Sequence, residues 1–485
     1  MSSISRHKTA IKRPDLSRPI RLALEHGLLN RETSFFDYGC GYGDDINRLN
    51  EQGIRSTGWD PIHRPGHERT KADVVNLGYV VNVIEDVDER ATVLRDAWSF
   101  AQKLLIVSAR LSLEANNGIS QNPFADGYVT SRGTFQKFYE QHELCDWINE
   151  VLSVSSVAVA PGIFYVFRDQ NLLQSFAASR YRRTTSTPRQ KHSNVVFEQY
   201  RELFDPLITF LTGRGRLPDY SELQIASAIK EKIGSLQRAF AIIRKVTGAE
   251  QWEHIREERS QDLLVYLALS RFGGRPRLSQ LPADLQLDIR AFFSNYRRAC
   301  ELADDLLFSA GKPEMIREAC RKSPIGKQTP DALYVHISAL PLLSPVLRVY
   351  EGCARAYIGT IEGANIVKLH QGKPQVSYLY YPDFESDPHP ALAASLVVPL
   401  RTFQIHYREY VNSTNPFILH RKETFIAPDH PLRSEFACLT EQEESYNLYE
   451  RPELIGTREG WQKVLDERGV HHVGHKLSEN ETQAF

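Results

Sequence analysis

The amino-terminal third of the chain alternates short apolar runs with longer polar segments. The run 103–109 (KLLIVSA) is mainly apolar, which is typical of a strand buried on both faces of a sheet. Two further runs, 154–160 and 163–167, are separated by a Pro-Gly pair and predict a terminal hairpin. Together with strand patterns at 53–60 and 73–83, they predict an α/β fold with a Rossmann-like sheet.

Polar segments with helical periodicity separate these runs. Ser17 is placed to cap a helix whose first turn contains Pro19. A second helix is expected to begin near Asp45, a third to run through Trp98, and a fourth to span 131–152.

The residue composition and the spacing of apolar residues then change twice along the chain. Residues 178–193 contain five basic residues and no acid among small polar residues, which is typical of a flexible linker, although clustered cations can also contact phosphates. From Phe197 to about Ser323, apolar residues recur at spacings of three and four, which predicts helices. From Pro330, short segments rich in Tyr, His and Pro predict a mixed α+β region.

A chain of 485 residues is too long for one ordinary hydrophobic core, so several domains are expected. The patterns predict a first α/β domain with a basic arm over residues 1–175 and a basic linker over 176–196. A helical domain over 197–329 and a mixed α/β carboxyl-terminal domain over 330–485 follow.

Glycines occupy alternate positions in the segment FFDYGCGYGDD. Without a Cβ, Gly39, Gly41 and Gly43 let the backbone after a strand approach a ligand, although a tight turn without a ligand would show the same residues. The spacing D-x-G-x-G-x-G differs from the G-x-G-x-x-G of dinucleotide sites and resembles motif I of class I S-adenosylmethionine-dependent methyltransferases. This resemblance implies that the turn, Cys40 included, passes under the amino-acid part of the cofactor and that Asp37 orders its methionine end.

Asp60 stands at the carboxyl end of the second predicted strand, about 20 residues past the glycines. An acid at that position can accept hydrogen bonds from both ribose hydroxyls, so Asp60 is predicted to bind the cofactor ribose. Only twelve residues separate Asp60 from Asp73, where the next strand is expected. We therefore expect the usual third strand, with its adenine-binding acid, to be reduced or displaced.

The strand that begins at Asp73 ends in the sequence Asn76-Leu77-Gly78-Tyr79. Enzymes that methylate exocyclic amines of DNA carry D/N/S-P-P-Y/F there, where the polar residue binds the amine and the aromatic ring stacks on a flipped base. Asn76 and Tyr79 keep that spacing and are the predicted catalytic residues, although both prolines are missing and ordinary strand-end residues would look alike. A thiolate attack on cytosine is not expected, since no Pro-Cys pair occurs in this region.

Composition and charge narrow the class of protein only slightly. The formal net charge is −1 and the isoelectric point about 7.0, so a nucleic-acid surface would have to be local. Residues 5–21 hold six Lys or Arg against one acid. Such an arm can cover the cofactor pocket, contact phosphates or remain solvated.

The sequence gives little indication of a targeting segment, a membrane span or a metal-binding motif. The start of the chain has no apolar core of signal-peptide length and no segment approaches the roughly 18 apolar residues of a membrane span, so a cytoplasmic protein with no membrane association is expected. Six separated cysteines without a C-x-x-C pair argue against a structural zinc site. His471, His472 and His475 lie in a polar tail and are expected to be solvated rather than metal-bound.

The motifs combine into a wider resemblance. They are RHKTAIKRPDLSRPIRLAL, FFDYGCGYGDD, GWDP, DVVNLGYVVNVIED, VSYLYYPDFESDPHPAL, NPFILHRKETF and IGTREGWQ. Over nearly the whole chain they resemble the methyltransferases associated with bacterial DNA phosphorothioation systems. The resemblance implies S-adenosyl-L-methionine as cofactor, DNA as a partner, contact with proteins of such a system, and a role in DNA modification or antiviral defence.

Three hypotheses follow. The first is an S-adenosylmethionine-dependent methyltransferase acting on DNA. The second is methylation of RNA or a small molecule, which the missing prolines and the neutral charge favour. The third is a cofactor-binding subunit of a defence complex that has lost catalysis. The sequence leaves the target atom and the oligomeric state open.

Overall fold

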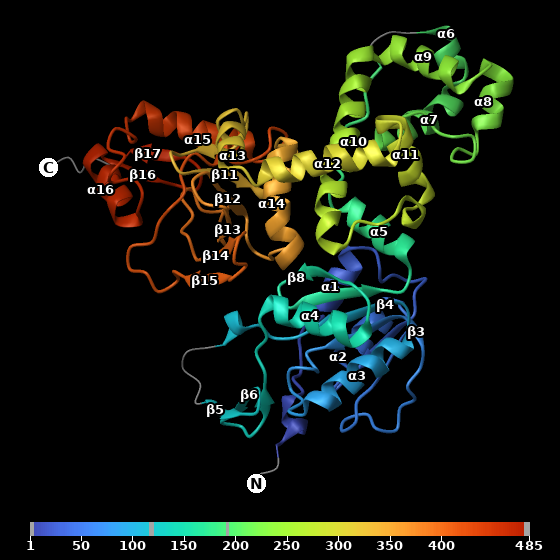
Figure 1. Ribbon diagram of the computed structural model, residues 1–485. Coiled ribbons are helices and arrows are strands. Elements are labelled where there is room, and N and C mark those ends of the chain that lie inside the picture. The colour runs from blue at the N-terminus through green and yellow to red at the C-terminus, as the bar shows by residue number, and fades with distance from the viewer. Residues whose placement is uncertain (1–3, 116–120, 191–193, 480–485) are drawn as a thin grey trace. The chain divides into compact units, whose positions relative to one another are not determined.

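The computed structural model describes residues 4–115, 121–190 and 194–479, and the chain divides into two compact units (Figure 1). Unit 1 comprises Met1–Gln170, Ala354–Glu362 and Phe403–Tyr407. Unit 2 comprises Asn171–Cys353, Gly363–Thr402 and Arg408–Phe485. Residues 191–193 of the predicted linker lie outside the described residues.

Unit 1 is built on a six-stranded sheet with strand order β2-β1-β3-β4-β9-β8. The strands β1 to β4 are parallel, whereas β9 is antiparallel to both of its neighbours. The strand bounds are β1 Phe35–Tyr38, β2 Ser56–Trp59, β3 Ala72–Gly78, β4 Ala101–Ser108, β8 Ser156–Ala160 and β9 Ile163–Phe167.

Helices cover both faces of this sheet (Figure 1). Phe36, Val75 and Leu105 lie on the same face of the sheet and form one core with α3 and α4, because every second residue of a strand points to the same face. On the opposite face α2 packs so closely that a Cβ on Gly58 would lie 2.4 Å from Ile46. The helix bounds are α1 Arg18–Glu25, α2 Asp44–Glu51, α3 Val87–Phe100 and α4 Gln141–Leu152, with short 3-10 helices η1 Arg6–Thr9 and η2 Ser112–Glu114.

The sequence patterns predict most of this unit correctly. The Rossmann-like sheet and the terminal hairpin are confirmed, and no strand lies between β2 and β3, as the short connection predicted. The helix expected over 131–152 is wrong in its first half. Gly133 adopts a positive φ of 74° and Phe135 is buried in a small sheet, so the helix begins only at Gln141. The small sheet comprises β5 Gln121–Phe124, β6 Gly127–Thr130 and β7 Phe135–Gln136.

The first part of unit 2 is helical, as predicted. Its core contains apolar side chains from successive helices, among them Phe204, Ile229 and Ile243, which are fully buried. The helix bounds are α5 Gln170–Ser179, α6 Val195–Gln199, α7 Arg201–Arg214, α8 Ala226–Ile233, α9 Leu236–Thr247, α10 Ala249–Leu269, α11 Ala283–Phe293, α12 Tyr296–Ala310 and α13 Pro313–Arg321, with η3 Ser270–Gly273 and η4 Leu278–Gln280.

The carboxyl-terminal part contains a second six-stranded sheet whose strands follow one another in sequence order, β10 to β15. The strand bounds are β10 Lys327–Gln328, β11 Ala332–His336, β12 Ile366–His370, β13 Gln375–Tyr380, β14 Ala394–Pro399 and β15 His406–Glu409. The remaining elements are η5 Ile337–Leu342, α14 Pro345–Ile358, η6 Lys422–Thr424, α15 Arg433–Ser445, α16 Arg458–Arg468, β16 Val470–His472 and β17 Leu477–Glu479. The predicted mixed region is therefore confirmed.

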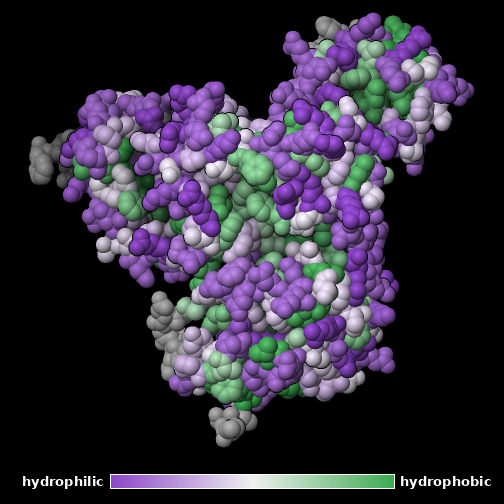
Figure 2. All heavy atoms as spheres, viewed as in Figure 1, coloured by the Kyte–Doolittle hydropathy of each residue, from purple (hydrophilic) through white to green (hydrophobic). Residues whose placement is uncertain are grey.

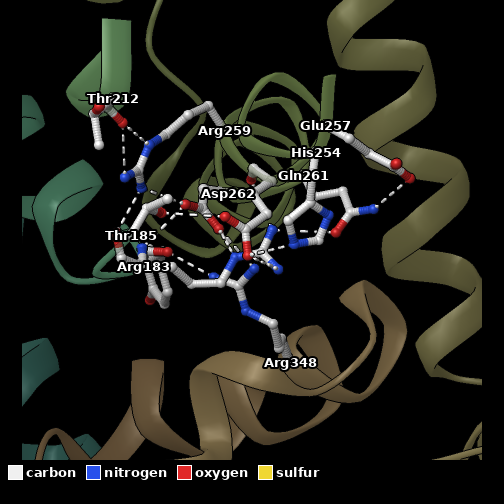
Figure 3. Close-up of polar contacts among 11 residues, drawn as sticks. Arg183, Thr185, Thr212, His254, Glu257, Arg259, Gln261, Asp262 and Arg348 are labelled. Carbon is white, nitrogen blue, oxygen red and sulfur yellow. Dashed lines mark hydrogen bonds and ion pairs between the residues drawn. The ribbon is translucent and has the colours of Figure 1, made fainter. Parts of the chain in front are cut away.

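A buried carboxylate anchors the start of the predicted linker (Figure 3). Asp262 is 5% exposed and accepts hydrogen bonds from the Nε of Arg183 (2.6 Å), Nη1 of Arg348 (2.8 Å) and Nη1 of Arg259 (3.2 Å). Arg348 also donates to the backbone oxygen of Tyr181 (2.6 Å). Arg183 is therefore bound inside unit 2, and its charge is not free to contact a phosphate.

Hydrophilic residues cover most of the face seen in Figure 2, and hydrophobic residues occur there in smaller groups. Within residues 4–115, 121–190 and 194–479, the helices are too short or too polar to cross a lipid bilayer.

We expect Asp262→Asn to destabilise unit 2. The substitution removes the negative charge but leaves three guanidinium groups buried around the site, and breaking such a buried pair costs about 3–5 kcal/mol. The midpoint of urea unfolding, followed by circular dichroism, measures the loss. Asp305→Asn on the exposed side of α12 is the matched control and should leave the midpoint unchanged; equal midpoints for both variants would contradict the anchoring role of Asp262.

Candidate functional site

A cavity of about 420 Å³ lies at the carboxyl ends of β1, β2 and β3. Because these strands are parallel and adjacent, their ends meet at one edge of the sheet, where open α/β sheets bind ligands. The volume is within the range of about 300–1,000 Å³ that is usual for small-molecule sites. Seven of the eight predicted site residues line the cavity: Asp37, Gly39, Cys40, Gly41, Asp60, Asn76 and Tyr79.

The glycine turn forms one wall of the cavity with bare backbone. Gly39 has a φ of 85°, and a Cβ at this position would lie 2.5 Å from Cγ2 of Val80. Gly43, the eighth predicted residue, precedes α2 with a φ of 84° and lies under the guanidinium of Arg64 rather than on the cavity wall. Gly39 and Gly43 are therefore required by conformation and by close approach, and Gly43 shapes the turn without lining the cavity.

Cys40 contributes its backbone N–H to the structure of the turn, and its thiol is not a reactive group. Burial raises the pKa of its thiol to about 12, so the group stays protonated at neutral pH. Its backbone N–H and that of Gly39 both donate to the backbone oxygen of Trp59 (3.1 and 2.8 Å), which ties the turn to the end of β2.

Asp37 is the buried acid of the cavity. Burial, with a smaller contribution from nearby Asp45, raises the pKa of its carboxyl group to about 7. Since this pKa exceeds the ordinary value of 3.8, Asp37 favours folding at low pH, and that contribution is lost as pH rises through about 7. Near neutral pH the carboxyl group can exchange its proton for a cationic partner.

Asn76 lies beside Asp37 on the neighbouring strand. The Asn76 side-chain amide donates to Oδ1 of Asp37 (2.8 Å), and the residue is only 3% exposed. Its own Oδ1 is buried and has no hydrogen-bond partner within the described parts of the chain. Asn76 therefore orients Asp37 and leaves one acceptor oxygen unsatisfied.

Asp60 connects two loops at the cavity. Its Oδ2 accepts a hydrogen bond from the backbone N–H of Gly41 (3.1 Å), and its Oδ1 accepts from those of Ile62 (2.9 Å) and His63 (2.8 Å). A carboxylate has about four lone-pair sites, so about one remains for a ligand hydroxyl.

Tyr79 closes the cavity at the end of β3 in an unusual backbone conformation. Its φ is 60°, which costs about 1–3 kcal/mol in a residue other than glycine. The conformation is held by a hydrogen bond from its backbone N–H to the oxygen of Ser108 (2.8 Å) and by Arg13, whose guanidinium lies 5.6 Å from the ring centre. Strain of this kind is concentrated at functional sites, which supports a role for Tyr79.

The basic amino-terminal arm covers the glycine turn. Ala10 lies against Gly41, and the backbone N–H of Arg13 donates to Oδ2 of Asp44 (2.8 Å). Arg6 forms ion pairs with Glu85 (2.9 Å) and Glu89 (2.6 Å). Of the three alternatives left open by the sequence, the arm therefore takes the one in which it covers the pocket.

Several wall residues were not identified from the sequence. Val80, Val83 and Ile84 line the cavity just beyond β3. The apolar run after Tyr79 is the signal that could have identified them, since apolar residues beyond a strand end suit the wall of a pocket.

We expect Gly39→Ala to destabilise unit 1, because the new Cβ would be forced into positive φ and against Val80. A strained residue of this kind costs about 1–3 kcal/mol. Thermal unfolding measures the effect. Gly66→Ala is the control, since a Cβ there meets no atom within 4 Å and the backbone φ is not positive; a midpoint as high for Gly39→Ala as for Gly66→Ala would show that the turn tolerates a side chain.

No protein-family model and no curated protein matches the chain. Solved structures are similar to part of it. The sugar N-methyltransferase KedS8 from Streptoalloteichus is 12% identical over 31% of this chain and 84% of that chain, with a TM-score of 0.25. A SAM-dependent methyltransferase from Aquifex aeolicus is 16% identical over 34% of this chain and 98% of that chain, with a TM-score of 0.23. The 1,6-didemethyltoxoflavin-N1-methyltransferase from Burkholderia thailandensis is 15% identical over 34% and 76%, with a TM-score of 0.22.

Proposed function

We propose that this protein is an S-adenosylmethionine-dependent methyltransferase whose cofactor binds in the cavity at the ends of β1, β2 and β3. The observation that carries the proposal is a cavity of about 420 Å³ with a bare glycine turn as one wall and a carboxylate at each of two strand ends. Asp37 faces the methionine ammonium group and Asp60 accepts from a ribose hydroxyl. Both the ammonium and the sulfonium of this cofactor are cationic, which suits an acidic cavity.

Methyl transfer from a sulfonium needs mainly an in-line approach of the acceptor, so positioning supplies much of the rate. Tyr79 stands at the end of β3, on the side where the acceptor enters in this proposal. Its ring, which the Arg13 guanidinium approaches to 5.6 Å, can stack on a planar acceptor such as a flipped base.

DNA is the acceptor that we propose, in a bacterial DNA modification or defence setting that includes proteins of a phosphorothioation system. This part of the proposal rests on the family resemblance of the sequence motifs and on the Asn76 and Tyr79 spacing.

One observation favours a second acceptor class, RNA or a small molecule. The tetrapeptide Asn76-Leu77-Gly78-Tyr79 lacks both prolines of the amine-binding D/N-P-P-Y sequence, although Oδ1 of Asn76 is still able to accept from an amine. An acceptor recognised by other groups is consistent with that arrangement.

Incubation of the purified protein with methyl-labelled cofactor and separate DNA, RNA and cell-extract fractions tests the proposal. Label on DNA supports the leading proposal, and label on RNA or small molecules supports the second. Cofactor binding without label in any fraction would indicate a non-catalytic subunit of a defence complex, and absence of cofactor binding would refute the proposed function.

We expect Asp60→Ala to weaken cofactor binding by about 1–3 kcal/mol, the usual loss for a charged hydrogen-bond partner. Both the ribose contact and the support of the Gly41 backbone would disappear. Isothermal titration calorimetry measures the change. Asp88→Ala, on an exposed position of α3, should bind as the wild type does; unchanged affinity in Asp60→Ala would exclude the ribose role.

Cofactor affinity should rise with pH. Asp37 has a pKa of about 7 in the free protein, so it is neutral below that pH and anionic above it. An anionic Asp37 attracts the methionine ammonium, and affinity should therefore increase between about pH 6 and pH 8. Calorimetry over this range measures the slope. Asp37→Asn cannot ionise and should give a flatter profile, and parallel profiles for the two proteins would contradict the assignment.

A further inference from the structure

A cluster of histidines surrounds one buried carboxylate in the carboxyl-terminal part of unit 2. Nε2 of His389 lies 2.6 Å and Nε2 of His472 lies 2.8 Å from Oε1 of Glu443. One nitrogen or oxygen atom from each of these three side chains lies within 4.8 Å of the others. Glu443 is fully buried, His389 is 6% exposed, and the side chain of His472 is 12% exposed.

Three motifs that the cofactor site does not use meet at this cluster. His389 belongs to VSYLYYPDFESDPHPAL, His420 to NPFILHRKETF, and Trp461 to IGTREGWQ. The ring centre of His389 lies 4.4 Å from that of His420 and 4.7 Å from that of Trp461. Segments separated by tens of residues therefore build one site.

The expectation that the last histidines are solvated is wrong for two of them. His472 contacts Glu443, and His475 receives a hydrogen bond at Nε2 from the buried Lys422 (2.8 Å). The reason is the β16–β17 hairpin, which packs against α15 and α16 (Figure 1) and carries the alternate residue His472 inward while His471 faces outward.

The hydrogen bonds around the cluster resemble those around a metal ion. Nδ1 of His389 faces the backbone oxygen of Leu419 (3.2 Å), which can accept only if Nδ1 carries the proton, and the lone pair is then on Nε2. Tyr449 donates to the other oxygen of Glu443. Backbone and side-chain partners of this kind commonly orient histidine and carboxylate ligands of metals.

His420 supplies a further polar atom that lacks a partner. The residue is 5% exposed and its Nε2 donates to the backbone oxygen of Ile455. Nδ1 is therefore an acceptor, and in the described part of the chain it has no hydrogen-bond partner. A water molecule bound to a metal ion would provide the missing donor.

The alternative is a purely hydrogen-bonded cluster. Without a metal, the two contacts of Oε1 of Glu443 with Nε2 of His389 (2.6 Å) and Nε2 of His472 (2.8 Å) each need a proton between the two atoms. A divalent ion at the same place replaces those protons.

We propose that His389, Glu443 and His472 bind one divalent transition-metal ion of the zinc class, with a water molecule beside His420 in the fourth position. Two imidazoles and one carboxylate suit zinc and disfavour calcium and magnesium, which prefer oxygen ligands. Tetrahedral bonds of about 2.0–2.1 Å place the ligand atoms about 3.3 Å apart, so the Nε2 atoms of His389 and His472 need to move only about 0.5–0.7 Å farther from Oε1 of Glu443. The ion would fasten the β16–β17 hairpin to α15 and to the segment before β14.

Untagged full-length protein tests the proposal. We expect about one zinc ion per chain by inductively coupled plasma mass spectrometry, lost after dialysis against dipicolinate. Co²⁺ added to the stripped protein should give the visible absorption of a tetrahedral nitrogen and oxygen site, saturating at one equivalent and reversed by Zn²⁺. Absence of bound zinc together with no saturable Co²⁺ spectrum would overturn the proposal.

Matched variants identify the ligands. His472→Ala and Glu443→Gln should abolish the Co²⁺ spectrum, whereas His471→Ala and Glu444→Gln, their exposed neighbours, should retain it. Tyr449→Phe should weaken binding by about 10- to 100-fold, as changes to residues that orient a ligand do.

Zn²⁺ should also raise the thermal midpoint of the wild type and of His471→Ala, but not that of His472→Ala. Identical spectra or identical zinc-dependent midpoints for His471→Ala and His472→Ala would assign binding elsewhere and refute the site. If a ligand variant does not fold, the metal content and Co²⁺ spectrum of the wild type still decide between the metal site and the hydrogen-bonded cluster.

Discussion

The parallel pairing of β1 with β2 and β3 is the constraint on which the candidate cofactor site depends. Parallel strands end at the same edge, so the turn after β1 and the loops after its neighbours must share that edge. The turn can pass there only as bare backbone, because a side chain on Gly39 would meet Val80. A cavity remains beside the turn, with Asp37 and Asp60 at its wall.

The wall of the cavity and the arm that covers it differ in the sign of their charged side chains. The wall carries carboxylates, one of which, Asp37, is buried enough to hold a proton near neutral pH. The arm that covers the turn is basic, and its Arg6 is paired with Glu85 and Glu89. Partly exposed ion pairs of this kind contribute only about 0–1 kcal/mol each, so these two pairs add little to the stability of the cover.

Unit 2 uses two buried acids in two chemically different ways. Asp262 is surrounded by arginines, which remain charged under all ordinary conditions, so this cluster can only join segments of the chain. Glu443 is surrounded by histidines, which can lose their protons and become ligands. The same structural need, to neutralise a buried carboxylate, therefore produces a fixed anchor in one place and a candidate metal site in the other.

The sequence by itself determined the Rossmann-like sheet and the reduced third strand, and seven of the eight site residues predicted from it line the cavity, because strand periodicity and glycine conformation are local properties. It did not determine that Asn76 donates to Asp37, that the basic arm covers the turn, or that His389 meets His472. These contacts join segments 31 to 83 residues apart. Whether a polar side chain is solvated or buried against a distant partner depends on how those segments pack. Only the tertiary structure decides that, since the cost of burying a charge depends on what surrounds it.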